Sequence, residues 1–315
     1  MTKGKVTVLG SNGHIGNAAM IAFRDAGWTV KGLGRTNRRP VERTTFVAGD
    51  ADDLAVVKAS IADADVVVYG LHLPYDKWGN GRAEQQLQVV IDAMGAGGKT
   101  LLFPGTIYNY RAGDRTISPV TRQSAEAPRG EIRIRLETML RQAAAAGKFQ
   151  AIILRGGDFY GPGNRGEWFE QGMLMEIGKG KVFHMGDLTM RHSWAYLPDL
   201  AVAFAMLAEK RASLAAFENF HFAGNWVSHG QMMAAIEAAL ESKAKVGPLQ
   251  WWVLGAIGLV NPMMRDVYRM RYIWGNEMEL VDPRLDALLG PSFGTPFEVA
   301  VAKTVRELVA AKAAA

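Results

Sequence analysis

The chain has 315 residues, of which 49% are hydrophobic and 21% are charged, a composition that allows a sizeable core and excludes intrinsic disorder as its main character. The absence of cysteine excludes disulfides, a cysteine nucleophile and thiolate metal ligands, and the six histidines lack the H-x-x-x-H spacing of zinc hydrolases. The net charge is +5, but the charges are interspersed except for one basic group, Arg35, Arg38, Arg39 and Arg43. We expect an ordinary solvated surface and no nucleic-acid partner.

The strongest apolar run extends from Trp251 to Val260, far short of the roughly 20 residues that a membrane-spanning helix needs. We expect this run to form a helix that is either buried or turned toward a partner. A strand predicted at Lys5–Leu9 begins almost at the first residue and leaves no room for a secretory signal. These features predict a soluble, cytoplasmic protein without a membrane partner.

Short apolar runs alternate with segments of helical length through the first half of the chain. Apolar strands separated by helices are typical of a parallel sheet covered on both faces. The predicted strands are Lys5–Leu9, Thr29–Gly32, Thr45–Val47, Asp65–Tyr69, Thr100–Phe103 and Ala151–Arg155, and the predicted helices are Ile15–Ala26, Ala55–Ile61, Ala83–Met94 and Glu131–Ala146.

After Gly161 this alternation becomes irregular, and Trp, Met and Gly become frequent. One further helix is predicted at Pro198–Leu207. From Trp226 to the C-terminus the pattern is mostly helical. Helix breaks are expected at Gly247-Pro248, Asn261-Pro262, Asp282-Pro283 and Gly290-Pro291.

The expected fold class is therefore α/β, with a doubly wound parallel sheet and a smaller, mostly helical C-terminal lobe. The first domain is predicted at residues 1–158, and residues 188–222 are expected to return to it. The lobe, at residues 159–315, is expected to face the substrate.

Gly10, Gly13 and Gly16 form a G-x-x-G-x-x-G pattern between the first predicted strand and the following helix. Glycine lets the backbone turn tightly and approach a pyrophosphate, and a helix N-terminus adds N–H groups and a partial positive charge. The pattern alone is weak, but a strand–loop–helix unit of this length matches a mononucleotide-binding βαβ unit. The residues expected to bind a dinucleotide cofactor are Gly10, Asn12, Gly13, His14, Ile15 and Gly16.

The end of the second predicted strand bears on the choice between NAD and NADP. A carboxylate at this place would accept hydrogen bonds from the adenine ribose and favour NAD. No acidic residue occurs between Lys31 and Arg39, and Arg35 lies about 20 residues after the glycine loop. Because a guanidinium can bind a 2′-phosphate through two hydrogen bonds, NADP is preferred. The alternative is a solvated basic loop.

At this point the sequence resembles the extended, atypical branch of the short-chain dehydrogenase/reductase superfamily, the group of NAD-dependent epimerases and dehydratases. Matching segments follow the glycine pattern in the expected order along nearly the whole chain. They are Gly49-Asp50 with Asp53-Leu54, Leu102 to Tyr108, Leu154 to Gly163, Trp194 to Ala201 and Thr295-Pro296-Phe297. The resemblance implies a Rossmann-type fold, cofactor contacts at Asp50, Leu71 and Arg133, and a possible homodimer formed through the long helices.

The chain departs from this family at its catalytic signature, a Tyr-x-x-x-Lys at the start of the long helix. In the family the tyrosine is the acid and base, and the lysine lowers the tyrosine pKa from about 10 and holds the nicotinamide ribose. With Glu137 as the point of alignment, Arg129 and Arg133 occupy the two positions. Arg129 cannot transfer a proton at neutral pH, whereas Arg133 could hold the ribose or an anion. Alternatively, both arginines face solvent and pair with Glu137 and Glu126.

Other groups are candidates for the missing chemistry. Thr106, at the end of the fifth strand, matches the hydroxyl with which the family binds a substrate oxygen, or it is a plain turn residue. Tyr108 and Tyr160 follow the fifth and sixth strands, and loops beyond the carboxyl ends of parallel strands surround the ligand site. Either phenol could serve as acid and base.

Asp158 and His72 are further options for proton transfer, although a lone histidine is more often structural. His192, beside Arg191 and Trp194, could line the pocket. An aromatic and methionine-rich wall would suit an apolar ligand, unless these side chains form the core of the lobe. Its candidate members are Trp168, Phe169, Met173, Met175 and Trp194.

Two functions follow. The first is an NADP- or NAD-dependent enzyme, either an oxidoreductase or an epimerase or dehydratase, that acts by hydride transfer. Its substrate would be a small carbonyl or hydroxyl compound, and the candidate aromatic and methionine-rich wall favours an apolar one. Its candidate catalytic residues are Thr106, Tyr108, Arg133 and Tyr160. The second is a regulatory protein that binds NADP(H) without catalysis, because loss of the tyrosine and lysine is what such a protein would show.

Overall fold

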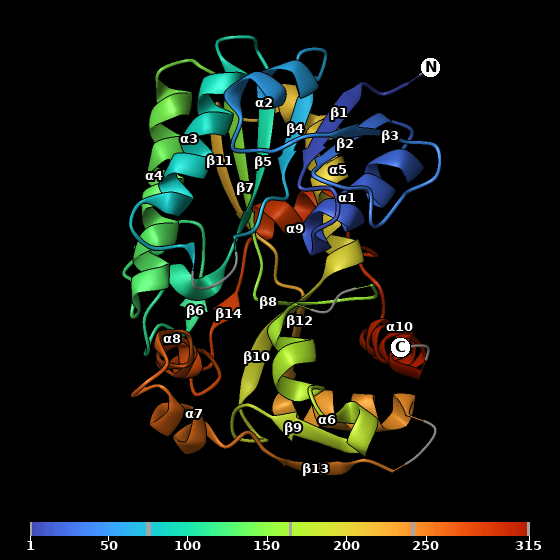
Figure 1. Cartoon of the computed structure of the whole chain (residues 1–315), viewed down its shortest axis with the longest axis vertical. Coiled ribbons are helices and arrows are strands. Elements are labelled where there is room, and N and C mark those ends of the chain that lie inside the picture. The colour runs from blue at the N-terminus through green and yellow to red at the C-terminus, as the bar shows by residue number, and fades with distance from the viewer. Residues whose placement is uncertain (1, 74–76, 164–165, 241–242, 314–315) are drawn as a thin grey trace.

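The computed structural model describes residues 2–73, 77–163, 166–240 and 243–313. Its upper part is a sheet of seven strands, all parallel (Figure 1). In spatial order the strands are β11 (Phe217–His221), β7 (Gln150–Arg155), β5 (Thr100–Gly105), β4 (Val66–Tyr69), β1 (Lys5–Leu9), β2 (Thr29–Gly34) and β3 (Thr45–Ala48). The order reverses at β1, which is the doubly wound, Rossmann-type arrangement that the sequence predicted.

Helices cover both faces of this sheet because its central strands are apolar throughout; β4 and β5, for example, are buried along their whole length. One layer consists of α1 (His14–Asp25), α5 (Leu197–Lys210) and α9 (Pro283–Leu289), and the other of α2 (Leu54–Ser60), α3 (Arg82–Met94) and α4 (Pro128–Ala145). Each layer buries its own apolar cluster against one face of the sheet, so the sheet separates two hydrophobic cores.

The predicted strands and helices of this part are confirmed, with ends that differ by at most three residues. α4 begins earlier than predicted, because Pro128 suits the first turn of a helix, where its missing N–H is not needed. The seventh strand, β11, escaped prediction. Its sequence mixes polar and apolar residues, and within the described chain it pairs only with β7 at the sheet edge.

After β7 most of the chain builds the lower part of the molecule, whereas α5, β11 and α9 return to the large sheet (Figure 1). Three small sheets pair β8 (Asp158–Tyr160) and β12 (Asn225–Ser228) with β10 (Arg191–Tyr196), β9 (Lys181–His184) with β13 (Lys245–Pro248), and β6 (Thr116–Ile117) with β14 (Glu279–Leu280). The helices here are α6 (His229–Ala239), α7 (Trp251–Ile257), α8 (Pro262–Arg269) and α10 (Phe297–Ala313). The boundary at residues 158 and 159 stays a prediction.

The helix breaks have different structural outcomes. Asn261 and Asp282 cap α8 and α9, since their side chains accept hydrogen bonds from backbone N–H groups of the first turn. Gly290 ends α9 with a φ of +89°. Gly247-Pro248, expected as a break between helices, instead ends a strand, because the segment pairs with β9. Trp226, expected to begin helix, lies in β12 opposite Ser193.

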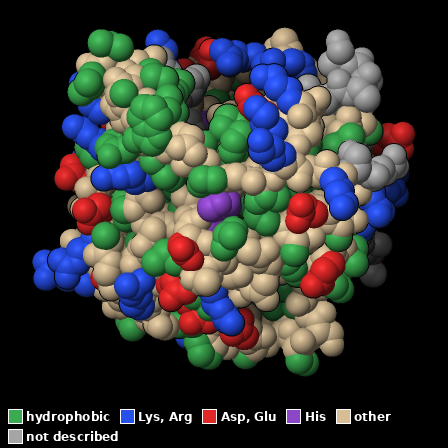
Figure 2. Space-filling view, turned by 90° about the horizontal axis from the view of Figure 1, so that it is seen from below, with side chains coloured by type: hydrophobic (Ala, Val, Ile, Leu, Met, Phe, Trp, Pro, Cys, Tyr) green, Lys and Arg blue, Asp and Glu red, His purple; other side chains and the backbone are tan. Residues whose placement is uncertain are grey.

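The apolar run from Trp251 to Val260 folds as α7 and the turn that follows. No residue of α7 is buried, so the buried alternative is wrong. Figure 2 shows hydrophobic side chains gathered at the upper left of the lower face, on the side where Figure 1 places α7 and α8. No helix within the described residues combines the length and hydrophobicity that crossing a membrane requires.

Candidate functional site

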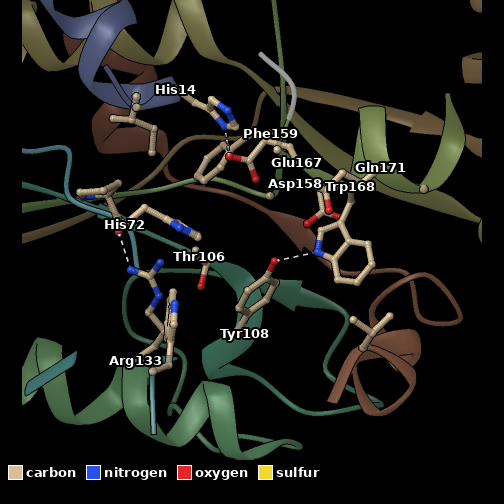
Figure 3. A pocket seen from close by; sticks show the side chains of 18 of the residues that line it. His14, His72, Thr106, Tyr108, Arg133, Asp158, Phe159, Glu167, Trp168 and Gln171 are labelled. Atoms are coloured by element: carbon tan, nitrogen blue, oxygen red, sulfur yellow. Dashed lines mark hydrogen bonds and ion pairs between the residues drawn. The ribbon is translucent and has the colours of Figure 1, made fainter. Parts of the chain in front are cut away.

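A cavity of about 760 Å³ opens at the carboxyl ends of β1, β4 and β5 (Figure 3). At one end it is lined by Gly13, His14 and Ile15 of the glycine loop. The middle is lined by the polar side chains of His72, Thr106, Tyr108, Arg133 and Asp158, with the Trp78 ring against Arg133 and His72. The far end is apolar and comprises Met175, Leu249, Leu254, Met263, Met264 and Val267.

The glycine loop has no room for side chains at its first and third glycines. A Cβ on Gly10, whose φ is +77°, would lie 2.5 Å from the Gly70 oxygen, and a Cβ on Gly16 would lie 2.2 Å from the Gly10 oxygen. α1 follows without a side-chain cap or an acidic residue in its first turn, and its first N–H groups have no intrahelical acceptor. This end of the cavity therefore fits the pyrophosphate of a dinucleotide.

Asn12 in the glycine loop holds the basic segment after β2, a link for which the residue pattern contains no signal. Its Oδ1 accepts hydrogen bonds from the backbone N–H groups of Arg38 (2.9 Å) and Arg39 (3.1 Å), and its Nδ2 donates to the Thr36 oxygen. The Arg35 and Arg38 side chains are exposed. Arg39 is half-buried, and burial lowers its pKa, although Glu307 opposes that shift.

The remaining cofactor candidates lie apart from each other. Leu71 lines the cavity. Asp50 is exposed in the turn before α2, where its Oδ1 accepts a hydrogen bond from the Asp52 N–H at 3.1 Å, and it is not among the residues that line the cavity.

Thr106 directly follows β5 and lines the cavity with a side chain that is buried. Its carbonyl oxygen accepts a hydrogen bond from Arg155 Nη1, which fixes the backbone. Its hydroxyl oxygen, by contrast, has no hydrogen-bond partner among the described residues. A buried hydroxyl without a partner is costly, so this oxygen is suited to bind a polar atom of a ligand.

Tyr108 lies on the same wall, in a short 3-10 turn at Ile107–Asn109 (Figure 3). Its phenol oxygen accepts a hydrogen bond from Trp168 Nε1 at 3.0 Å. The backbone of Tyr108 packs closely on α4, since a Cβ on Gly130 would lie 2.0 Å from the backbone carbonyl oxygen of Tyr108. The phenol is thereby held in one place beside Thr106.

The arginines at the positions of the family's tyrosine and lysine have different surroundings. Arg133 lines the cavity, donates from Nη1 to the Pro104 oxygen at 3.3 Å and lies 4.6 Å above the Trp78 ring. Arg129 is buried away from the cavity lining, and its Nη2 lies 3.9 Å from Asp266 Oδ2 on α8. The alternative of two solvent-facing arginines paired with Glu137 and Glu126 is therefore wrong.

Glu137 instead pairs with Arg155, a contact missed from the sequence. Glu137 Oε2 lies 2.7 Å from Arg155 Nη2, and the same carboxylate accepts hydrogen bonds from Asn109 and Gln123. Burial alone would lower the pKa of Arg155, but the neighbouring Glu137 carboxylate outweighs burial, and the pKa is raised. One signal was available: a charged residue at the end of an otherwise apolar strand needs a partner when buried. The pair supports the backbone of Thr106.

Asp158 lines the opposite wall and receives two hydrogen bonds from the lower part of the molecule. Its Oδ2 accepts from His192 Nε2 at 3.0 Å and from Trp274 Nε1 at 2.7 Å. His192 is fully buried behind it. His72 also lines the cavity, and its side chain is exposed.

Tyr160 is not brought to this cavity. The ring is fully buried against Phe169 and Tyr196, and its hydroxyl accepts a hydrogen bond from Asn225 Nδ2 at 2.8 Å. Burial also raises its pKa. The five residues predicted to form an aromatic and methionine-rich wall fall into two groups. Trp168 and Met175 line the cavity, whereas Phe169, Met173 and Trp194 belong to the core of the lower part.

Glu167 and Glu170, which sequence reasoning did not single out, lie in the segment that closes the cavity on one side. Glu167 Oε1 lies 2.6 Å from His14 Nδ1, so this segment is fastened to the first turn of α1. Glu170 is buried, and its Oε2 accepts a hydrogen bond from the Glu167 N–H at 3.1 Å. Burial, aided by the Glu167 charge, raises the pKa of Glu170 to about 8.

Comparison with known proteins agrees with this fold. The model of the NAD dependent epimerase/dehydratase family matches residues 6–222. No curated protein matches the sequence. A solved structure of UDP-glucose-4-epimerase from Stenotrophomonas maltophila, with bound NAD and formylated UDP-arabinopyranose, has a TM-score of 0.78 at 16% identity, over 99% of this chain and 100% of that chain.

Two further solved structures are similar. MoeE5 in complex with UDP-glucose and NAD has a TM-score of 0.75 at 16% identity and covers 98% of this chain and 100% of its own. The Bordetella bronchiseptica enzyme WbmH in complex with NAD+ has a TM-score of 0.72 at 18% identity, over 97% of this chain and 98% of that chain. At such identities the likeness establishes the fold.

Proposed function

The chain belongs to the NAD-dependent epimerase/dehydratase family of extended short-chain dehydrogenases/reductases, and from this premise we propose that it is an NADP(H)-dependent oxidoreductase of an apolar carbonyl or alcohol. The observation that carries the proposal is the Thr106 hydroxyl, which is buried, lacks a hydrogen-bond partner among the described residues and faces the cavity beside Tyr108. A substrate oxygen would satisfy it.

The cofactor would be held at the glycine loop and the first turn of α1, with Arg133 near its nicotinamide end. When bound there, the dinucleotide supplies the hydride donor or acceptor. The preference for NADP rests on the segment after β2, which has no acidic residue and which Asn12 holds in place. Arg35 and Arg38 are exposed there and suited to a 2′-phosphate.

The chain's own residues would position the substrate and move one proton. Thr106 orients the reacting oxygen through its hydroxyl. Tyr108 holds a proton on its phenol oxygen, and Trp168, which donates a hydrogen bond to that oxygen, orients the phenol. Arg129, in the position of the family's tyrosine, stays protonated and is engaged with Asp266.

The lining of the cavity supports an apolar substrate. Arg133 is the only Lys or Arg among the described lining residues, which also include the carboxylates of Asp158 and Glu167. A diphosphate, as in the UDP-sugars named for the similar structures, would need more positive charge at the substrate end. The thioether and aromatic side chains there instead suit an apolar body carrying one polar oxygen.

A second function, an NADP(H) sensor without catalysis, is favoured by one observation: Arg129 and Arg133 replace the residues that carry the family's usual acid–base chemistry. Both functions require the dinucleotide. They differ in whether bound NADPH is oxidised by a substrate.

Calorimetry with NADPH and NADH, followed by NADPH oxidation with a panel of apolar aldehydes and ketones, tests the proposal. Binding with turnover supports the oxidoreductase, and binding without turnover across the panel supports the sensor. Thr106→Val is expected to abolish turnover while NADPH affinity stays unchanged. The control is Thr138→Val on the exposed side of α4, where the hydroxyl bonds the Ile134 oxygen. Unchanged turnover in Thr106→Val would remove Thr106 from the site.

A further inference from the structure

The hairpin of α7 and α8 exposes large apolar side chains at its tip. Neither helix contains a buried residue. Trp252 is 71% exposed, and Leu259 and Val260 in the connecting turn are 83% and 88% exposed. Single exposed apolar residues are ordinary, but a cluster of them marks an interaction surface. Figure 2 shows this gathering of hydrophobic side chains with Lys and Arg side chains close to it.

The tip is held firmly by close backbone packing. A Cβ on Gly258 would lie 2.9 Å from the Arg265 Cα, and one on Gly255 would lie 3.1 Å from the Tyr268 ring. Asn261 caps α8 by accepting hydrogen bonds from two backbone N–H groups of its first turn. The exposure of Leu259 and Val260 is thus a feature of a packed turn.

The inner side of the same hairpin lines the candidate site. Leu254 of α7 and Met264 and Val267 of α8 line the cavity. Met263 belongs to both surfaces, because it lines the cavity and is 40% exposed. Met263 therefore links the exposed side of the hairpin to the substrate end of the cavity.

The charges around the tip are mainly positive. From Trp251 to Arg271 the chain has three arginines, at 265, 269 and 271, and one acidic residue, Asp266. The Asp266 carboxylate is engaged by Arg129 and Arg269. Two copies of this chain meeting through the face would bring like charges together, which disfavours a dimer here. Exposed Trp and Leu beside Arg is instead typical of a segment that lies in the interface of an anionic membrane.

We propose that the α7–α8 hairpin docks on a lipid bilayer surface that carries anionic headgroups. Leu259, Val260 and Trp252 enter the apolar boundary of the bilayer, while Arg265 and Arg269 lie among the headgroups. This contact would give the chain a membrane partner, whereas the sequence analysis expected none. A consequence, which rests on the proposed function, is that substrates dissolved in the bilayer reach the cavity past Met263.

The test uses the full chain and vesicles of phosphatidylcholine, alone or with about 30% phosphatidylglycerol, in a sedimentation assay. The chain is expected to bind the anionic vesicles, and about 0.5 M salt is expected to weaken that binding. The double variant Leu259→Asp with Val260→Asp is expected to lower the partition coefficient at least about ten-fold. The control is the double variant Val299→Asp with Val309→Asp, which places the same two charges at exposed positions of α10 and is expected to bind as the unmodified chain does.

Absence of binding to anionic vesicles would overturn the proposal, as would equal binding by the double variant. A dimer in solution that the double variant dissociates, without vesicle binding, would assign the face to a second copy of the chain and also overturn it. NADPH calorimetry on the same preparations separates this outcome from failure of the proposed function. The double variant is expected to retain full NADPH affinity, since both changed residues are exposed and outside the cavity lining.

Discussion

The cofactor end and the substrate end of the cavity are walled differently. At the cofactor end the wall is main chain: Gly10 and Gly16 allow backbone segments to approach closely, and α1 presents its first N–H groups. At the substrate end the wall is side chains, among them Trp168, Leu254 and Met263, from segments far apart in sequence. Backbone recognises a pyrophosphate that many enzymes share, whereas side chains set the substrate class.

This difference also separates what tolerates substitution. A glycine beside backbone has no room to adjust, because the neighbouring main chain, at Gly10 and Gly70, directly follows strands of the central sheet. A methionine at the substrate end can change rotamer and can be replaced by another apolar residue at small cost. Substitutions at the cofactor end are therefore expected to abolish binding, and those at the substrate end to change rate or selectivity.

The largest effect is expected from Gly16→Ala. The added Cβ would lie 2.2 Å from the Gly10 oxygen, and the loop must move to accept it. We expect NADPH affinity, measured by calorimetry, to fall at least about 100-fold, the loss that comes with about 2.7 kcal/mol. The control is Gly178→Ala, where a Cβ meets nothing within 4 Å. Equal affinity of Gly16→Ala and Gly178→Ala would show that the loop does not bind the cofactor.

Tyr108→Phe tests the middle of the cavity, where the two ends meet. If the phenol donates the proton, turnover with the best carbonyl substrate is expected to fall by about 100-fold or more, the usual contribution of a general acid, at unchanged NADPH affinity. Tyr160→Phe is the matched control, because its hydroxyl bonds Asn225 in the core. That variant is expected to lose about 1 kcal/mol of stability but no turnover. Normal turnover in Tyr108→Phe would exclude Tyr108 as the proton donor.

The contrast between the two ends explains how far the sequence could lead. The cofactor end is local: Gly10 to Gly16 and the flanking strand and helix lie within one short segment, and the sheet follows from apolar runs of fixed period. Two contacts there were hidden from the sequence: Asn12 binds the backbone of Arg38 and Arg39, which depends on how β2 ends beside the loop, and His14 pairs with Glu167.

The substrate end depends on contacts between distant residues. Trp168 bonds Tyr108 across 60 residues, and Trp274 bonds Asp158 across 116. No periodicity in the sequence encodes such pairs. Tyr108 and Tyr160 were equivalent in the sequence, since both follow strands, yet β8 leaves the large sheet and carries Tyr160 into the core of the lower part.

Glu170→Gln measures how much the buried carboxyl group of Glu170, in the segment that closes the cavity, lowers the stability of the folded chain. Burial raises the pKa of Glu170 from 4.5 to about 8, so the folded chain holds this proton more tightly than the unfolded chain. The resulting stabilisation is complete below about pH 4.5 and is lost as pH rises through about 8. Glutamine keeps the shape without the charge, so relative to the unmodified chain the variant is expected to gain on the order of 3 kcal/mol between pH 4.5 and 8.5.

Urea unfolding at the two pH values checks this difference. Glu237→Gln, on the exposed side of α6, is the control and is expected to show no such gain. A Glu170→Gln variant whose stability follows that of the unmodified chain at both pH values would mean that the carboxyl group ionises at the same pH in the folded and the unfolded chain.

Arg35→Asp is expected to have the smallest effect and bears on the one side-chain contact proposed for the cofactor end. Loss of an exposed guanidinium from a 2′-phosphate is expected to weaken NADPH binding about ten-fold, and NADH binding much less. The control is Arg43→Asp, which changes the charge of the same basic group but removes a side chain whose Nη2 lies 3.8 Å from Asp25 Oδ1. Equal weakening of both cofactors by Arg35→Asp would mean that the basic segment acts only through its net charge, and that recognition at this end rests on backbone alone.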